Sequence, residues 1–249
     1  MPIVRILLVL LAFASPALAQ DGARKAAAAR EAAQAFQVYV EGVAKKGERP
    51  DLTRPEVAAL LGRVFDLGGL NALPPTQASD ISWLLDWNDA ANTVNKLITR
   101  FGSKPGPQPD LEALQRNMTE YEDQYAAGMN FMIRAQARQA VSSKLFMAEL
   151  APEQRTRVRE KGFMGARSSS AEFILSTICA TIENGGKPAN ARLLAAAIRD
   201  TREVWANFFL PQDRARVIAY LAELQKRVPD ETARTDLATF TAALQAVNI

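Results

Sequence analysis

Histidine is absent from this sequence of 249 residues. Because histidine is the usual general base near neutral pH and the commonest metal ligand, its absence excludes the Ser-His-Asp triad, the ordinary zinc site and histidine ligation of haem. Phosphate-binding loops, dinucleotide-binding glycine motifs, calcium loops and haem-attachment motifs are also missing. The sequence therefore predicts a protein that holds no cofactor and no metal ion.

Cysteine occurs only once, at Cys179, so an internal disulfide is impossible. Cys179 lies in an apolar run from Phe173 to Ile182, and a thiol in such a run usually behaves as a small buried hydrophobic group. We therefore expect Cys179 to be buried. A reactive or cross-linking thiol is the alternative.

An apolar run long enough to span a membrane is also missing. The longest run, from Ile6 to Ala14, is far shorter than the roughly 20 residues that a transmembrane helix needs. It follows Arg5 and precedes Pro16 and the small residues of Ala17-Leu18-Ala19, which is the pattern of a secretory signal peptide. We predict that residues 1–19 are removed and that the protein is not an integral membrane protein; a retained membrane anchor is the alternative.

The residues after the predicted cleavage point indicate the compartment. The chain has no cysteine there to carry a bacterial-type lipid anchor, so we expect a soluble periplasmic or secreted protein of bacterial type. Neither sign of charge predominates, because 30 Lys and Arg stand against 27 Asp and Glu. Nucleic-acid-binding proteins concentrate basic charge on one face, and an exported protein rarely meets nucleic acid, so we expect no nucleic-acid partner.

Strand-like alternation of β-branched and polar residues is absent, whereas apolar residues recur at spacings of three and four. This pattern predicts an all-α, multi-helix bundle of about eight helices. We expect the alanine-rich start of the first helix, residues 26–34, to be solvated, and chain breaks at Gly68-Gly69 and at Gly162 to Gly165. The predicted helices lie near residues 22–46, 54–67, 79–101, 110–150, 152–161, 169–183, 190–209, 211–228 and 231–247.

Residues 102–109 (GSKPGPQP) contain three prolines and two glycines, which forbid regular structure. We therefore predict a boundary there between an N-terminal helical part, residues 20–101, and the main helical bundle, residues 110–249. Farther along the chain, Pro211 is placed to open a helix and Asp230 to cap the last one.

The most unusual local pattern lies in the predicted helix 79–101. Trp83 and Trp87 stand one turn apart, and Asn88, Asn92 and Asn95 form a neighbouring strip. Stacking rings beside amide groups are common in sugar and peptide sites, so we identify Trp83, Trp87, Asn88 and Asn92 as a hypothetical ligand-binding site. The alternative is that the indoles belong to the core and the asparagines to a solvated edge.

Four other patterns are less specific. Met129 and Met132 offer thioethers that suit Cu(I), but no third soft ligand lies nearby in the sequence, so we interpret them as core filling. Glu183 is a helix-end acid, and Ser142-Ser143-Lys144 lacks the spacing of a serine–lysine pair. A row of basic residues could form a patch for an anionic partner or simply a solvated face; its members are Arg134, Arg138, Lys144, Arg155, Arg157, Arg159 and Lys161.

These features favour a non-catalytic binding or envelope-associated interaction protein whose ligand or envelope partner is unknown. The alternative is an enzyme that acts on cell-envelope glycans, because glycan-cleaving enzymes can work with carboxylates alone. A binder of an apolar or sugar ligand between helices, using Trp83 and Trp87, is the third possibility.

Overall fold

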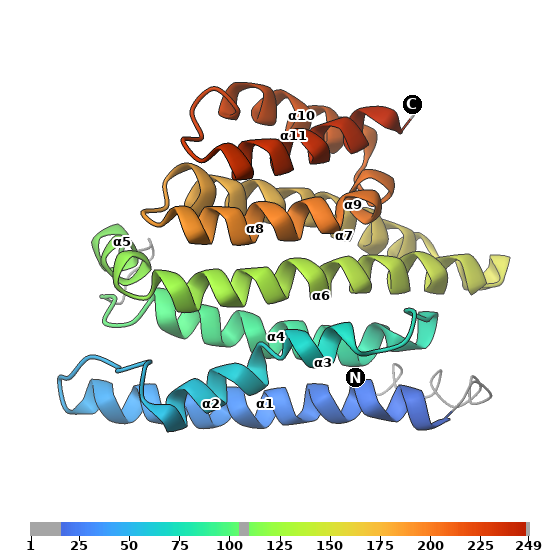
Figure 1. The fold of residues 1–249 in the computed structure, drawn as a ribbon. Helices are drawn as coiled ribbons and strands as arrows, with labels where there is room; N and C mark the ends of the chain where they lie inside the picture. The colour runs from blue at the N-terminus through green and yellow to red at the C-terminus, as the bar shows by residue number, and fades with distance from the viewer. Residues whose placement is uncertain (1–15, 105–109, 248–249) are drawn as a thin grey trace.

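The computed structural model describes residues 16–104 and 110–247. Most of the predicted signal peptide, residues 1–15, and the last five residues of the predicted loop, 105–109, therefore lie outside the described residues. All regular structure within the described ranges is helical, which confirms the all-α prediction (Figure 1). None of the described helices is long and apolar enough to cross a membrane.

Five helices form a ladder: taken in chain order, each of the five packs against the next of the five (Figure 1). The ladder runs from the blue end to the red end of the molecule in Figure 1. Its members, in order, are α1 (Pro16–Lys45), α4 (Ile81–Thr99), α6 (Glu122–Glu149), α8 (Pro188–Asp200) and α11 (Glu231–Ala246).

The remaining helices cover this ladder. The first of them pack on α1, α4 and α6, and the later ones pack on α6, α8 and α11. The early ones are α2 (Pro55–Val64), α3 (Leu67–Asn71) and α5 (Leu111–Glu120), and the later ones are α7 (Arg157–Thr177), α9 (Arg202–Phe208) and α10 (Pro211–Leu224). Pro211 opens α10, and the Asp230 side chain accepts a hydrogen bond from Ala233 N at the start of α11, as the sequence predicted.

One hydrophobic core runs through the molecule, from Phe36 on α1 to Phe240 on α11. Trp87, Phe131 and Trp205 are fully buried within it. The predicted N-terminal part and the predicted main bundle therefore share a core, because α4 packs directly against α6.

One face of the alanine-rich segment 26–34 of α1 is buried, so the expectation that the whole segment is solvated was wrong; Arg30, Glu31 and Gln34 on its other face are exposed. Ala26, Ala29, Ala32 and Ala33 face α4 and the core. Their small side chains allow two helices to approach closely while still removing apolar surface from water. The alanines that the composition suggested to be solvated therefore form the contact between α1 and α4.

The predicted helix 110–150 is divided at Tyr121 into α5 and α6, and this break has a tertiary cause. The buried Asn117 side chain donates hydrogen bonds to Thr99 O and Phe101 O, at the end of α4. The Tyr121 hydroxyl donates to Pro50 O. These contacts fix α5 across the end of α4 and direct the chain into α6. A similar division at Thr201 separates α8 from α9.

Neither glycine pair breaks the chain where it was expected to. Gly162 and Gly165 lie within α7, and Gly68 and Gly69 lie within α3, whose first turn is capped by Asp66 accepting from Gly69 N. A glycine inside a helix costs about 1 kcal/mol relative to alanine, an amount that tertiary packing easily offsets.

Cys179 is exposed, so the prediction of a buried thiol was wrong. Ala171, Ile174, Ile178 and Ile182 recur three or four residues apart and form the buried face of this segment, which ends in a π-helical turn over Ile178–Glu183. Ile178 and Ile182 point into the core, and Cys179 lies at the surface.

Two glycines give opposite predictions for alanine substitution. A β-carbon at Gly162 would meet no heavy atom within 4 Å, so Gly162→Ala is expected to raise the free energy of unfolding by about 1 kcal/mol. A β-carbon at Gly128 on α6 would lie 2.3 Å from Asn95 Oδ1 and 2.8 Å from Phe65 Cζ. Overpacking typically costs about 1–3 kcal/mol, so Gly128→Ala is expected to lower that free energy.

Urea denaturation followed by circular dichroism measures both changes, and Gly162→Ala serves as the matched control. Equal stabilisation by the two substitutions would contradict the close contact between α4 and α6 at Gly128.

Candidate functional site

A cleft runs along α6, with α4 on one side and α7 on the other. We call it the interhelical cleft. Its larger chamber has a volume of about 800 Å³ and reaches α5, and its smaller chamber, of about 330 Å³, reaches α9. Asn92, Met132 and Phe173 line both chambers, so the two form one continuous surface feature.

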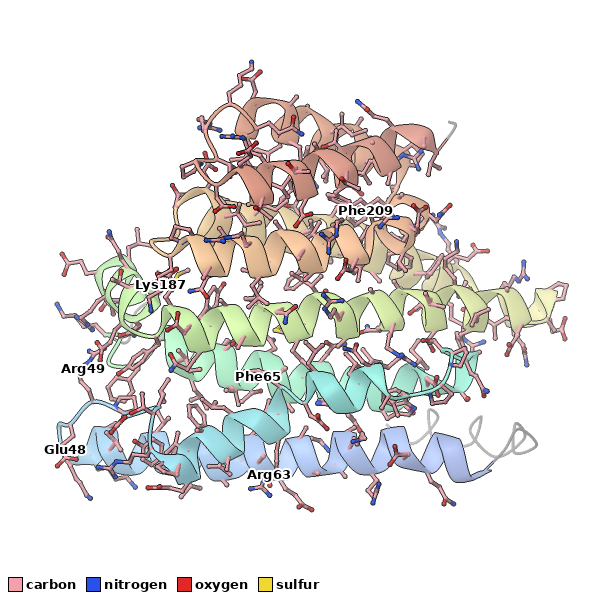
Figure 2. All side chains as sticks on the ribbon, in the orientation of Figure 1. Glu48, Arg49, Arg63, Phe65, Lys187 and Phe209 are labelled. Atoms are coloured by element: carbon pink, nitrogen blue, oxygen red, sulfur yellow. The ribbon has the colours of Figure 1, made fainter. Side chains whose placement is uncertain are left out.

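The position of α5, which closes one end of the cleft, depends on Arg49. Its guanidinium donates to Glu120 Oε1 and Asn117 Oδ1, both at 2.9 Å, and lies over the Tyr121 ring. The hydrogen bond with Glu120 raises the pKa of Arg49. Arg49 and Lys187 lie towards the same end of the molecule in Figure 2. There, Lys187 N donates to the buried Glu122 carboxylate at the start of α6.

The floor of the larger chamber is apolar and is formed mainly by flexible thioether side chains. Met118 on α5 and Met129 and Met132 on α6 line it together with Tyr125. Asn95 Nδ2 donates to Met132 Sδ at 3.1 Å and lies 3.7 Å from Met129 Sδ. Burial raises the pKa of Tyr125, so its phenol remains neutral at physiological pH.

Amide side chains line the middle of the cleft. Asn88 Nδ2 on α4 donates to Gln139 Oε1 on α6 at 2.7 Å, whereas Asn88 Oδ1 is buried and has no hydrogen-bond partner among the described residues. Asn92 is half-buried between the two chambers. An unpaired buried acceptor costs about 1–3 kcal/mol, so a donor that reaches Asn88 Oδ1 would recover this free energy.

Hydroxyl groups from α7 line the opposite wall. Ser170 Oγ donates to Ala166 O and Thr177 Oγ1 donates to Phe173 O, so both hydroxyls use their protons within their own helix. Their oxygens can therefore only accept further hydrogen bonds. Ser169 and Ser176 also line this wall.

The end of the cleft beside α5 is basic. Lys96, Arg100 and Lys104 line it together with one acid, Asp110. Asp110 caps α5: its carboxylate accepts from Ala113 N and Lys104 N, both at 3.0 Å, and these hydrogen bonds lower its pKa. Lys96 and Arg100 form no ion pair with any residue that the structure describes.

The structure separates the four residues of the hypothetical ligand site. Trp83 Nε1 donates to Asp80 Oδ1 at 3.1 Å, and Trp87 Nε1 donates to Val64 O at 2.9 Å. Both indoles are buried, and the ring centroid of Trp87 lies 5.2 Å from that of Phe131. Asn88 and Asn92, from the same helix, line the interhelical cleft instead.

The other sequence patterns fall in different places. Met129 and Met132 lie together in the cleft, where Met118 joins them through tertiary packing. Glu183 accepts a hydrogen bond from the Tyr220 hydroxyl and pairs with Arg227 at 2.9 Å. Burial and this hydrogen bond raise the pKa of Tyr220. The described residues contain no group of three His, Cys, Asp or Glu side chains that could hold a metal ion.

The basic row on the later helices is partly structural. Arg134 on α6 pairs with Asp200 at 2.8 Å, and Arg138 donates to Leu70 O and Pro74 O, which fixes the segment before α4. Burial lowers the pKa of Arg138. Arg155 donates to Leu150 O at the end of α6, and Arg159 on α7 donates to Gln154 O just before that helix. Several of these cations are therefore bound within the protein.

The buried indole of Trp87 generates a prediction about stability. Trp87→Phe would leave Val64 O buried without a donor, which costs about 1–3 kcal/mol, and would remove packing against Phe131. We expect the urea midpoint to fall and the cleft to keep its shape. An unchanged midpoint would contradict the role of this indole in the core.

No protein family, curated protein or solved structure matches this chain. Its function is therefore inferred from the residues of the cleft and from the chemistry they permit.

Proposed function

We propose that this chain is an exported, non-catalytic binding protein whose ligand lies in the interhelical cleft. One observation carries the proposal: the middle and the floor of the cleft are lined by neutral amides, hydroxyls and thioethers, and Asn88 has a buried acceptor without a partner among the described residues. Such groups orient and hold a ligand through hydrogen bonds and apolar contact, and they supply neither a strong acid nor a strong nucleophile.

The alternative, a carboxylate-dependent enzyme acting on envelope glycans, needs two acids that face each other, one with a raised pKa. Of the described acids that line the cleft, Asp110 lies in the larger chamber and Asp89 in the smaller one. Hydrogen bonds lower the pKa of Asp110, which is the opposite of what a general acid requires, and Asp89 is exposed. These features favour binding over glycan cleavage.

A sugar ligand stacked on Trp83 and Trp87 has less support. Both rings are packed against other side chains, and both indole N–H groups already have partners. Asn88 and Asn92 retain their place in the proposed site, because they line the cleft.

The proposal includes export to the periplasm or the medium. Helix α1 begins at Pro16, so cleavage after Ala19 would remove only its first residues and leave the buried alanines from Ala26 onward in place. The predicted signal peptide and the folded part are therefore compatible with one another.

Export is tested by the mass of the protein recovered from the periplasm of expressing bacteria. We expect a chain that begins at Gln20, and we expect Ala19→Arg to block processing because signal peptidase requires a small residue there. Ala17→Gly keeps a small residue and is the control. An unprocessed chain that remains in the cytosol would contradict export.

The cleft is tested by filling it. Asn92→Trp places a large ring where the two chambers meet, whereas Ser82→Trp adds the same ring at an exposed position of α4 outside the cleft. We expect ligands found in a panel of peptides and envelope-glycan fragments to raise the melting temperature of the wild type and of Ser82→Trp, and to leave that of Asn92→Trp unchanged.

The same panel separates the two functions. Intact binding by Asn92→Trp would overturn the cleft as the ligand site. Release of soluble fragments from cell-wall glycan, lost in Asp89→Asn or Asp110→Asn, would overturn the non-catalytic function in favour of the enzyme.

A further inference from the structure

The class of ligand follows from the different side chains that line successive parts of the cleft. Its middle is lined by amides, its floor by thioethers, and the end beside α5 by cations. This inference rests on the proposed function, because it identifies the ligand of the same cleft.

The amides of α4 match the repeat of an extended peptide. Asn88 and Asn92 are four residues apart on a helix that rises 1.5 Å per residue, so they stand about 6 Å apart along its axis. An extended chain repeats every two residues, or about 6.6–6.8 Å. Each amide carries both a donor and an acceptor, as a peptide unit does. Successive amides can therefore pair with backbone groups of alternate ligand residues.

The unpaired acceptor distinguishes between apolar and peptide ligands. Asn88 Oδ1 is buried and lacks a donor among the residues that the structure describes, while its Nδ2 is held by Gln139. The acyl chain of a lipid offers no donor to this oxygen, whereas a backbone N–H does. The hydroxyl oxygens of Ser170 and Thr177 on the opposite wall can likewise accept from backbone N–H donors.

The floor suits the apolar side chains of such a peptide. Met118, Met129 and Met132 line the larger chamber, and Phe173 lies where the chambers join. Unbranched thioether side chains adapt their shape to different apolar groups, as they do on peptide-binding surfaces in general. Alternate residues of an extended chain point the same way, so apolar side chains at every second position would face this floor.

The charge at the α5 end indicates what else the ligand carries. Lys96 and Arg100 stand one turn apart on α4, and neither pairs with an acid among the described residues. Glu41 of α1 borders a separate hollow that these two cations also line, but forms no ion pair with them there. The only acid of the chamber, Asp110, is engaged in capping α5. This end therefore presents an excess of positive charge to a ligand.

We propose that the interhelical cleft binds an extended polypeptide segment that carries acidic residues at one end and apolar residues at every second position. The acidic residues lie against Lys96 and Arg100, the backbone pairs with Asn88 and Asn92, and the apolar side chains lie on the methionine floor.

The probe for this proposal is a short fluorescein-labelled peptide, aspartate-rich in one half and alternating leucine and threonine in the other. Amidation of its C-terminus removes the terminal carboxylate, so any charge effect comes from the acidic side chains. Fluorescence anisotropy measures its Kd for the mature protein. We expect saturable binding that weakens with added salt, and no binding of the same peptide with lysine in place of aspartate.

Two charge-reversed variants form a matched pair. Lys96→Glu with Arg100→Glu is expected to raise the Kd by about tenfold or more. Lys144→Glu with Lys161→Glu makes the same change of net charge at exposed positions outside the cleft, and is expected to change the Kd by less than about twofold. Equal effects of the two pairs would show that only overall charge matters, and would overturn the proposal.

Backbone recognition has its own test. Methylating alternate amide nitrogens of the probe removes donors without changing its side chains, and we expect binding to be lost. Binding that survives would contradict the pairing with Asn88 and Asn92. Saturable binding to vesicles of anionic phospholipid, with none to the peptide, would assign the basic end to a lipid surface and overturn the proposal.

The outcomes distinguish this inference from the proposed function. If the acidic peptide does not bind but Asn92→Trp still blocks another ligand, the inference fails and the proposed function stands. If the acidic peptide binds the wild type and Asn92→Trp equally, the cleft is not the binding surface and both fail.

Discussion

At Gly128, helix α6 comes so close to α4 that a β-carbon there would lie 2.3 Å from Asn95 Oδ1. This approach places the Asn95 amide between the two helices and directs its Nδ2 towards the methionines of α6. It also makes α6 the central helix of the ladder, since the same helix packs against α5, α7, α8 and α9. Helices α4, α5, α7, α8 and α9 are therefore each positioned directly against α6.

The cleft is a consequence of that arrangement. Helices α4 and α7 both pack on α6, and the space between them is lined by residues of all three. Polar groups that face this space lose hydration without gaining full hydrogen bonding, which lowers stability. The core of alanines and aromatic side chains elsewhere compensates, because burying apolar surface contributes roughly 25 cal/mol per Å².

The helix ends that the sequence predicted well are governed by local chemistry. Pro211 and Asp230 act within a few residues of themselves, through a fixed backbone angle and a side-chain cap. The failures lie where distant residues decide the outcome. Tyr121 ends α5 because its hydroxyl and the nearby Asn117 bond to residues of earlier segments. Cys179 is exposed because Ile174, Ile178 and Ile182 form the face that packs into the core, and which face of an apolar run is covered depends on the helices that pack against it.

The sequence by itself determined the absence of histidine chemistry and of disulfides, and it determined an all-helical chain. Composition and short-range periodicity suffice for those conclusions, because they depend on residue identity and on neighbours three or four positions apart. Only the tertiary structure decided that Trp83 and Trp87 belong to the core while Asn88 and Asn92 line a cleft with α7. The tryptophans and the asparagines lie on neighbouring faces of the same helix, and which face is covered depends on the distant helices that pack against it.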